Sequence, residues 1–301
     1  MSVESLTTAP LRGDLLTDEP LARYTSWRVG GPARRFYRPA DVEDLVAFMR
    51  RLDPEEPLLW LGLGSNLLIG DEGFDGTVIL TQGGLTALER RGETRIHAEA
   101  GVSCAKLARF AARHDLVGVE FLAGIPGTMG GALAMNAGAW GGETWACVQR
   151  VWTLDRAGRI REREAGNYVP AYRQVKGPPG EWFLAAEWEL PHGDGQAGLA
   201  RIRALLDRRA ATQPVGLPSC GSVFRNPPGD HAARLIESLG LKGLRIGGAQ
   251  VSEKHANFII NSGDATATDI ASLINHVQEA VERRTGIRLV PEVRRVAGER
   301  P

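Results

Sequence analysis

Apolar residues recur at helical spacing in five stretches of the chain. From Asp41 to Leu52 they form a single stripe, and Asp41 stands where a helix N-cap is expected. The same spacing predicts four further helices, at 103–114, 199–211, 231–239 and 268–285. Ser103 is the expected N-cap of the first of these, and Gly240 and Gly286 follow the ends of the last two. In the helix at 199–211 four residues are expected to face inward: Leu199, Ile202, Leu205 and Leu206.

Short apolar runs bounded by turn residues predict strands between these helices. They lie at 58–61, 77–81, 95–98, 148–154, 182–190, 244–251, 258–261 and 289–296. We expect the last three to form one sheet beneath the C-terminal helices. Because the helices and strands do not alternate as they do in a Rossmann fold, the pattern predicts the α+β class.

Shifts in this pattern divide the chain into four parts. Residues 1–19 are polar and aperiodic, so we expect a loose N-terminal arm. Glycines near residue 82 separate a first block, 20–82, from a second block, 83–194. The clearest linker runs from His192 to Gly198 and leads into a third block, 195–301.

Charge and cysteine content exclude several classes of protein. Lys+Arg and Asp+Glu both number 36, and this zero balance argues against a general binder of nucleic acid or of anionic membranes. The three cysteines are not paired as CxxC, which argues against a disulfide framework or a metal site. Residues 121–142 carry no charge but contain seven glycines and Pro126, so we expect a buried turn region and not a membrane span. With no apolar run of signal-peptide length near its start, the chain is expected to be cytoplasmic.

Two glycine-rich loops are candidates for binding a ligand. The first runs from Gly62 to Leu68 directly after a predicted strand, and the second begins at Gly124 and reaches Gly142. Glycines let the backbone approach a ligand closely, and successive free N–H groups bind anions. A pyrophosphate or a planar ring fits such loops, although neither loop matches the GxGxxG or the Walker pattern. Taken alone, the first loop fits a glycine-rich hairpin turn equally well.

Other segments carry side chains suited to binding or catalysis. Ser222 lies in a Gly-Ser-Val-Phe-Arg-Asn-Pro segment. The GxSxG nucleophile elbow is absent and no His–acid pair has a recognisable spacing, so the sequence does not support a hydrolase. Glu292 lies in an apolar strand, where, taken alone, a carboxylate more often forms an ion pair with a neighbouring arginine than acts as an acid. The pair Tyr172-Arg173 suits a carboxylate, and His255 is compatible with either a structural or a binding role.

Taken together, these segments resemble the UDP-N-acetylenolpyruvoylglucosamine reductase family, also called UDP-N-acetylmuramate dehydrogenase. Eight pieces match in the family's order and cover roughly residues 20–297, which makes the resemblance very specific. The matching pieces are Arg28–Ala33, Gly62–Leu68, Gly124–Ala132, Tyr172-Arg173, Gly221–Pro227, Leu241–Gly243, Ile246–Ala249 and Pro291–Arg294.

The resemblance implies a two-subdomain FAD-binding unit of the vanillyl-alcohol-oxidase type, followed by a C-terminal α+β substrate-binding domain. FAD-binding subdomain 1 would be 20–82, subdomain 2 would be 83–194, and the substrate-binding domain would be 195–301. FAD would bind non-covalently, because neither loop contains a His or Cys to attach it. The residues implied for the cofactor are Gly62, Gly64, Ser65, Asn66, Leu67, Gly124, Ile125, Pro126, Gly127, Gly130, Gly131, Ala132, Asn136 and Gly138.

The same resemblance implies catalytic and substrate-binding residues. Ser222 would donate a proton, and Arg173 and Glu292 would complete the active site. The residues expected to bind substrate are Tyr172, Arg173, Asn226, Lys242 and His255. The reaction would be the NADPH-dependent reduction of UDP-N-acetylglucosamine enolpyruvate to UDP-N-acetylmuramate, in peptidoglycan precursor biosynthesis, by a cytoplasmic and monomeric enzyme.

Some residues depart from the family's pattern. Val175 stands where the family usually has a serine, and Arg225 stands where lysine is common. The interval between Arg173 and Ser222 lacks the extra loop that supplies a tyrosine over the substrate in one subclass. Two alternatives stay open at this point: an oxidase with the same flavin fold, and a nucleotide-sugar sensor without activity. Flavin colour would exclude the sensor, and turnover of the enolpyruvyl substrate would exclude the oxidase.

Overall fold

The computed structural model describes residues 10–296, which belong to two compact units. Unit 1 comprises the segment up to Thr17 together with 35–62 and 76–207. Unit 2 comprises 18–34, 63–75 and the chain from Arg208 onward. Each unit is therefore built from separated segments of the chain. The domain boundaries expected at 82/83 and 194/195 stay a prediction.

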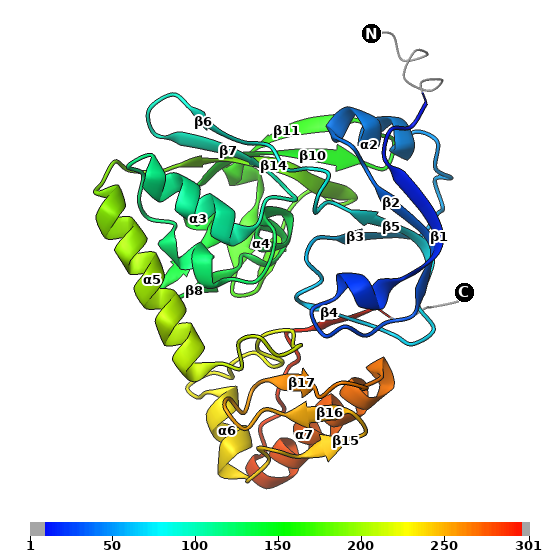
Figure 1. Ribbon diagram of the computed structural model, residues 1–301, viewed down its shortest axis with the longest axis vertical. Coiled ribbons are helices and arrows are strands. Elements are labelled where there is room, and N and C mark those ends of the chain that lie inside the picture. Colours follow the sequence, from blue (N-terminus) through cyan, green and yellow to red (C-terminus); the bar gives the residue numbers. More distant parts are fainter. Residues whose placement is uncertain (1–9, 297–301) are drawn as a thin grey trace. The chain divides into compact units, whose positions relative to one another are not determined.

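Unit 1 contains a five-stranded antiparallel sheet in the order β11-β10-β14-β7-β6 (Figure 1). Its strands are β6 (Leu88–Arg91), β7 (Arg95–Glu99), β10 (Val148–Asp155), β11 (Ile160–Glu164) and β14 (Glu181–Glu189). Two helices, α3 (Cys104–Arg113) and α4 (Met129–Met135), pack against it. Leu107 of α3 and Leu133 of α4 share one core with Val151 and Trp188 of the sheet, and all four are fully buried.

A second sheet has the order β1-β2-β5-β3. Its strands are β1 (Asp14–Pro20), β2 (Pro32–Arg38), β3 (Leu58–Leu61) and β5 (Phe74–Leu80), and β3 pairs with β5 in parallel. Three of these strands, β1, β2 and β5, contain residues at which the chain passes from one unit to the other. Helix α2 (Val42–Met49) packs on the unit 1 part of the sheet, where Leu45 meets Tyr37 and Ile79.

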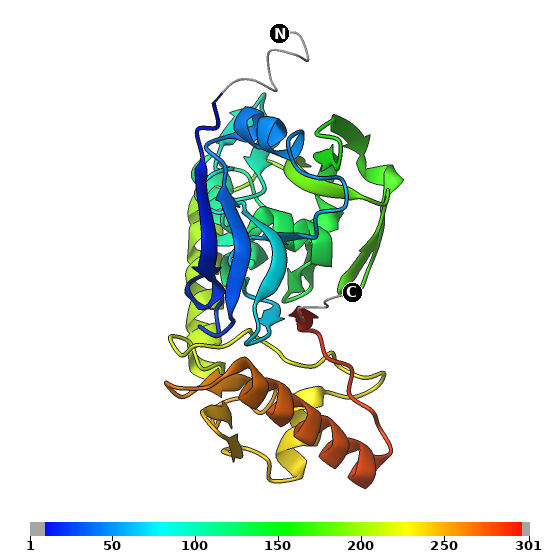
Figure 2. The same cartoon turned by 90° about the vertical axis from the view of Figure 1, so that its right-hand side faces the viewer.

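Unit 2 contains a three-stranded antiparallel sheet packed against two helices (Figure 2). The strands are β15 (Arg245–Ile246), β16 (Ala249–Val251) and β17 (Ile259–Asn261), and the helices are α6 (Ala232–Ser238) and α7 (Ala267–Thr285). Strand β18 (Arg294–Val296) pairs in parallel with β4 (Leu67–Ile69). The unit's core runs from Trp27 through Leu68 and Phe224 to Ile274, so distant segments of the sequence share it.

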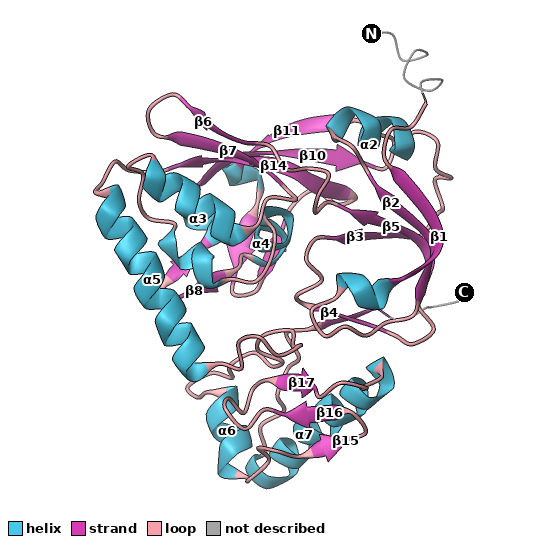
Figure 3. Cartoon of the chain, in the orientation of Figure 1, coloured by secondary structure: helices cyan, strands magenta, loops and turns pink. Residues whose placement is uncertain are grey.

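Short elements complete the described chain (Figure 3). Four are 3-10 turns: η1 (Leu21–Tyr24), η2 (Glu120–Gly124), η3 (Thr144–Ala146) and η4 (Ala165–Asn167). Four are short strands that form two hairpins: β8 (Gly138–Ala139) with β9 (Gly142–Glu143), and β12 (Val169–Ala171) with β13 (Gln174–Lys176). The uncharged stretch 121–142 contains most of η2, the whole of α4 and the β8–β9 hairpin up to Gly142. Within residues 10–296 no helix has the length and apolar character needed to cross a membrane.

The helices expected from periodicity are confirmed, and so are their caps. Asp41 accepts a hydrogen bond from the backbone N–H of Asp44 at the start of α2, and Ser103 accepts one from Lys106 at the start of α3. Gly286 ends α7 at φ +73°, a conformation that glycine adopts without steric cost. Caps involve only neighbours in sequence, which is why the sequence predicts them.

The predicted linker 192–198 is wrong in its second half. Helix α5 runs from Gly195 to Thr212 because the Asp194 carboxylate accepts hydrogen bonds from the N–H groups of Gln196 and Ala197. Of its four residues expected to face inward, Ile202 is buried, whereas Leu199, Leu205 and Leu206 are half-buried.

Three other predictions are also wrong, one about the N-terminal arm and two about strands. Residues 14–19 belong to β1 and not to a loose arm; their exposed, polar character is that of an edge strand. Residues 1–9 of the arm lie outside the described part of the chain. The strand expected at 244–251 is divided into β15 and β16 by Gly247, which turns at φ +51°. The strand expected at 289–296 is reduced to β18, which pairs with β4 instead of joining the C-terminal sheet.

Candidate active site

The second glycine loop of unit 1 is held by backbone hydrogen bonds to the segment before α3. The N–H of Cys104 donates to the carbonyl of Gly127 at 3.0 Å. The N–H of Gly130 donates to the carbonyl of Ala100 at 2.9 Å, and that of Met129 donates to Val102 at 2.8 Å. The loop therefore has a fixed backbone on one side, as a preorganised binding loop needs.

The first glycine loop begins in direct contact with the second. A Cβ atom on Gly62 would lie 2.3 Å from Oγ1 of Thr128, so only glycine fits there. This Thr128 hydroxyl is buried and has no hydrogen-bond partner among the described residues. Gly131, three residues further, is exposed and has open space where a side chain would be. A buried hydroxyl without a partner beside bare glycine backbone is a site that a polar group of a ligand would complete.

The end of α4 is joined to the hairpins that follow it by Asn136. This residue is buried and adopts the left-handed conformation at φ +43°. Its Nδ2 donates to Glu143 at 2.9 Å and to the carbonyl of Ala171 at 3.3 Å, while its Oδ1 accepts from the N–H of Trp145 at 3.2 Å. Asn136 therefore holds the end of β12 directly before the turn that carries Tyr172 and Arg173.

Tyr172 and Arg173 form the two-residue turn between β12 and β13. Arg173 has φ +56°, which is unfavourable for a residue with a side chain. Its Nη1 donates to the carbonyl of Gly138 at 3.0 Å, and its guanidinium lies 5.3 Å from the ring centre of Tyr172. Tyr172 is 51% exposed. The strained turn thus holds an arginine against the Gly138 hairpin at the end of the second glycine loop.

In unit 2 the rest of the first glycine loop packs against the segment that carries Glu292. Gly64 has φ +61°, and a Cβ there would lie 2.1 Å from the carbonyl oxygen of Tyr24. The Asn66 side-chain amide donates to the backbone carbonyl of Glu292 at 3.2 Å, and the N–H of Arg294 donates to the Asn66 carbonyl at 3.0 Å. Asn66 therefore fixes the backbone on both sides of Val293.

Ser222 lies beside the same segment. The N–H of Glu292 donates to the carbonyl of Val223 at 2.8 Å, and the N–H of Arg225 donates to Val290 at 2.9 Å. This backbone pairing places the serine and the glutamate on neighbouring extended segments. Both residues are half-buried, as side chains that meet a substrate need to be.

Asn257 fixes the position of the serine segment. It is 4% exposed, its Oδ1 accepts from the N–H of Phe224 at 3.0 Å, and its Nδ2 donates to the carbonyl of Phe224 at 2.8 Å. Neither Asn257 nor Thr128 is among the site residues predicted from the sequence. A polar residue directly before the apolar run 258–260 is the signal that could have identified Asn257.

The remaining predicted substrate residues lie around this segment. Asn226 accepts a hydrogen bond from the N–H of Ala232 at 3.1 Å and so caps α6. His255 accepts one from the N–H of Asn257 at 3.3 Å, and burial, aided by the charge of Lys242, lowers its pKa below the usual 6.5. The Lys242 ammonium contacts the Glu237 carboxylate at 2.6 Å.

Each unit therefore brings together a subset of the predicted site residues. Unit 1 joins Gly62, the loop 124–132 and the hairpin with Arg173. Unit 2 joins the loop from Gly64 to Leu67 with the segments that carry Ser222 and Glu292.

Two family models match the chain. Residues 33–163 match the FAD binding domain, and residues 213–296 match the C-terminal domain of UDP-N-acetylenolpyruvoylglucosamine reductase. The first match confirms that the chain carries an FAD-binding domain, and the bare backbone at Gly131 and the Thr128 hydroxyl suit such a polar cofactor.

Relatives and a solved structure agree with these matches. A UDP-N-acetylenolpyruvoylglucosamine reductase from Methylococcus capsulatus is 62% identical and covers 97% of this chain and 96% of the relative. One from Alkalilimnicola ehrlichii is 63% identical over 95% of this chain and 96% of the relative. The crystal structure of a UDP-N-acetylenolpyruvylglucosamine reductase from Thermus caldophilus has a TM-score of 0.81 at 34% identity, covering 94% of this chain and 98% of that one. The expected fold class is confirmed. This chain therefore belongs to the UDP-N-acetylenolpyruvoylglucosamine reductase family of flavin-dependent oxidoreductases.

Proposed function

We propose that this chain uses NADPH to reduce the enolpyruvyl group of UDP-N-acetylglucosamine enolpyruvate to the lactyl ether of UDP-N-acetylmuramate. The observation that carries the proposal is the 62% identity, over 97% of the chain, to a reductase whose name states this substrate. The product would enter peptidoglycan precursor biosynthesis. We propose a cytoplasmic monomer with the domain boundaries expected from the sequence.

In this proposal the two glycine loops hold FAD without a covalent bond. Backbone N–H groups and the hydroxyls of Ser65 and Thr128 would bind the polar parts of the cofactor. The proposed cofactor residues are Gly62, Gly64, Ser65, Asn66, Leu67, Gly124, Ile125, Pro126, Gly127, Gly130, Gly131, Ala132, Asn136 and Gly138. Bound FAD would supply hydride, received from NADPH, to the terminal carbon of the enolpyruvyl double bond.

Arg173 would hold the carboxylate of the substrate. Hydride addition places negative charge on the carbon next to this carboxylate, and the charge delocalises onto the carboxylate oxygens. A planar guanidinium can donate two parallel hydrogen bonds to such a group, and the strained turn at φ +56° holds it in one place. Glu292 in its protonated form could donate a further hydrogen bond to the same oxygens. Each donor of this kind is typically worth about 10²–10³-fold in rate.

Ser222 would donate the proton that the carbanionic carbon needs. A serine hydroxyl is a weak acid, but the acceptor is strongly basic, so the transfer needs only close positioning. The pairing of Val223 with Glu292 and the two hydrogen bonds between the Asn257 side chain and the Phe224 backbone keep the serine segment in place. General acid catalysis typically contributes about 10²–10⁴-fold.

The nucleotide sugar would contact Tyr172, Asn226, Lys242 and His255. His255 is neutral near pH 7 because its pKa is lowered, and a neutral imidazole can accept a hydrogen bond as well as donate one. The exposed tyrosine and the Lys242 ammonium suit a uracil ring and a phosphate, respectively.

Substrate turnover tests this function. The flavin-loaded protein is mixed with NADPH and the enolpyruvyl substrate without oxygen, and the product is identified by mass spectrometry. We expect one reduced product per NADPH consumed, and no consumption with UDP-N-acetylglucosamine, which lacks the enolpyruvyl group. Flavin reduction by NADPH without any transfer to the enolpyruvyl substrate would overturn the proposal. Oxygen uptake with an alcohol or a sugar would point to an oxidase instead.

A further inference from the structure

A pocket of about 620 Å³ lies in unit 1. Its walls come from the end of α2, the turn between β10 and β11, and the loop before β14. We call it the arginine pocket, because Arg50, Arg156, Arg159 and Arg161 line it together with only two acids, Asp155 and Glu181. None of its residues belongs to the set proposed above for FAD or the nucleotide sugar.

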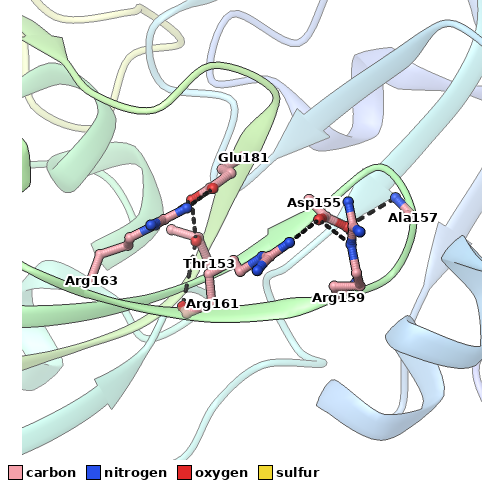
Figure 4. A network of polar contacts seen from close by, with 7 residues as sticks. All are labelled: Thr153, Asp155, Ala157, Arg159, Arg161, Arg163 and Glu181. Atoms are coloured by element: carbon pink, nitrogen blue, oxygen red, sulfur yellow. Dashed lines mark hydrogen bonds and ion pairs between the residues drawn. The ribbon is translucent and has the colours of Figure 1, made fainter.

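The two acids of the arginine pocket are already engaged (Figure 4). Asp155 accepts hydrogen bonds from the backbone N–H and from Nε of Arg159, at 2.9 and 2.8 Å, and lies 3.6 Å from Arg161. Although burial raises the pKa of Asp155, these hydrogen bonds lower it more, so the group stays ionised. Glu181 is paired with Arg163 at 2.5 Å and accepts from the Thr153 hydroxyl at 2.6 Å.

Two arginines of the pocket have no such partner. Nη1 of Arg50 and Nη1 of Arg156 are buried and have no hydrogen-bond acceptor among residues 10–296. Arg156 is held from its other side, where Nη2 donates to the backbone carbonyl of Glu56. The stem of Arg50 packs on the turn at Gly158, where a Cβ atom would lie 2.7 Å from its Cγ. Arg156 is thus anchored through Nη2 and Arg50 through its stem, while Nη1 of each has no acceptor among residues 10–296.

We propose that the arginine pocket binds the di- or triphosphate group of a small metabolite. With both acids of the pocket engaged by other residues, its four arginines leave an excess of positive charge, and phosphate oxygens would pair with that charge through charge-assisted hydrogen bonds. The excess of arginine over acid favours an anion with more than one charge. The volume falls within the usual ~300–1,000 Å³ of small-molecule sites, and the absence of an aromatic ring from the lining argues for recognition through phosphates.

Calorimetric titration with inorganic pyrophosphate tests the proposal on the flavin-loaded protein. We expect saturable binding of one pyrophosphate per chain, weakened about tenfold or more by Arg50→Gln and by Arg156→Gln, since each removes a charged donor. Arg109→Gln is the matched control. Arg109 is exposed on α3 in the same unit, so this variant should bind within about twofold of the parent.

ADP is titrated in parallel to separate free pyrophosphate from a nucleotide as the source of the phosphates. Tighter binding of ADP, lost in the same two variants, would assign the pocket to a nucleotide; tighter binding of pyrophosphate would assign it to the free anion. Unchanged thermal unfolding shows that a variant is folded. Where a Gln variant fails this check, the Lys variant at the same position is used instead. We expect it to bind more weakly than the parent, because an ammonium cannot donate two parallel hydrogen bonds to a phosphate as a planar guanidinium does. No saturable binding, or equal binding by parent and Arg50 variants, would overturn the proposal.

Discussion

Asn257 is expected to control both the stability of unit 2 and the position of Ser222. Its side chain makes two hydrogen bonds to the backbone of Phe224, at 3.0 and 2.8 Å, and is 4% exposed. Asn257→Ala leaves a buried N–H and a buried carbonyl without partners. Each such group costs about 1–3 kcal/mol, so the variant should lose about 2–6 kcal/mol of unfolding free energy.

Thermal unfolding measures this loss. At roughly 2–4 °C per kcal/mol, the midpoint should fall by at least about 4 °C. Asn257→Asp should also lose stability, because its carboxylate keeps the acceptor for the Phe224 N–H but places a second acceptor against the Phe224 carbonyl. Asn275→Ala is the control: Asn275 is exposed in the same unit and accepts from Arg295, so its loss should shift the midpoint by no more than about 2 °C.

The same variant tests the link between stability and catalysis. With the serine segment displaced, we expect the reoxidation of flavin by the enolpyruvyl substrate to slow about tenfold, equivalent to about 1.4 kcal/mol of barrier. Flavin reduction by NADPH should change less than twofold, since it needs no contact with this segment. An Asn257→Ala protein with parental midpoint and parental reoxidation rate would refute the reasoning.

Three further predictions concern other parts of the chain. Arg173→Lys should lower kcat/KM about tenfold or more, because an ammonium cannot form two parallel hydrogen bonds to a carboxylate; steady-state kinetics within about twofold of the parent would make Arg173 structural only. Asp71 accepts from the N–H groups of Ala267 and Thr268 at 2.8 and 2.9 Å. Burial raises the pKa of Asp71, but hydrogen bonds from Thr268 and Ala267 lower it by more, so the pKa lies below its usual 3.8. The ionised Asp71 carboxylate therefore stabilises the folded protein fully above pH ~3.8, and this stabilisation is lost as the pH falls through the folded-state pKa. The difference in unfolding midpoint between the parent and Asp71→Asn should accordingly shrink from pH ~7 to pH ~3. Acid precipitation should release all flavin into the supernatant, and flavin retained in the pellet would contradict non-covalent binding.

The sequence predicted the features that depend on neighbouring residues. The helix caps at Asp41, Ser103 and Gly286 need only contacts within a turn of helix, and the structure confirms each of them. The edge strand β1 was missed because its residues are exposed and polar, which is the pattern of a loop. The start of α5 was missed because Asp194 caps it from inside a segment rich in glycine.

Pairings between distant residues could not be predicted from local pattern. Strand β18 pairs with β4, so Arg294 lies opposite Leu67, and Asn66 reaches the backbone of Glu292 across 226 positions of sequence. Neither segment has a local pattern that identifies its partner, so the pairing becomes visible only in the folded structure. Resemblance to a known family singled out Ser222 and Glu292, whereas Thr128 and Asn257 emerged only from buried contacts.

The most direct test of the proposed mechanism compares the two half-reactions of Ser222→Ala by stopped-flow spectroscopy. Reduction of the flavin by NADPH uses no proton from Ser222, so its rate should stay within a few-fold of the parent. Reoxidation by the enolpyruvyl substrate needs that proton, so its rate should fall by at least ~10²-fold, the lower end for a general acid. Equal slowing of both half-reactions, or of neither, would contradict the assignment of Ser222 as the proton donor.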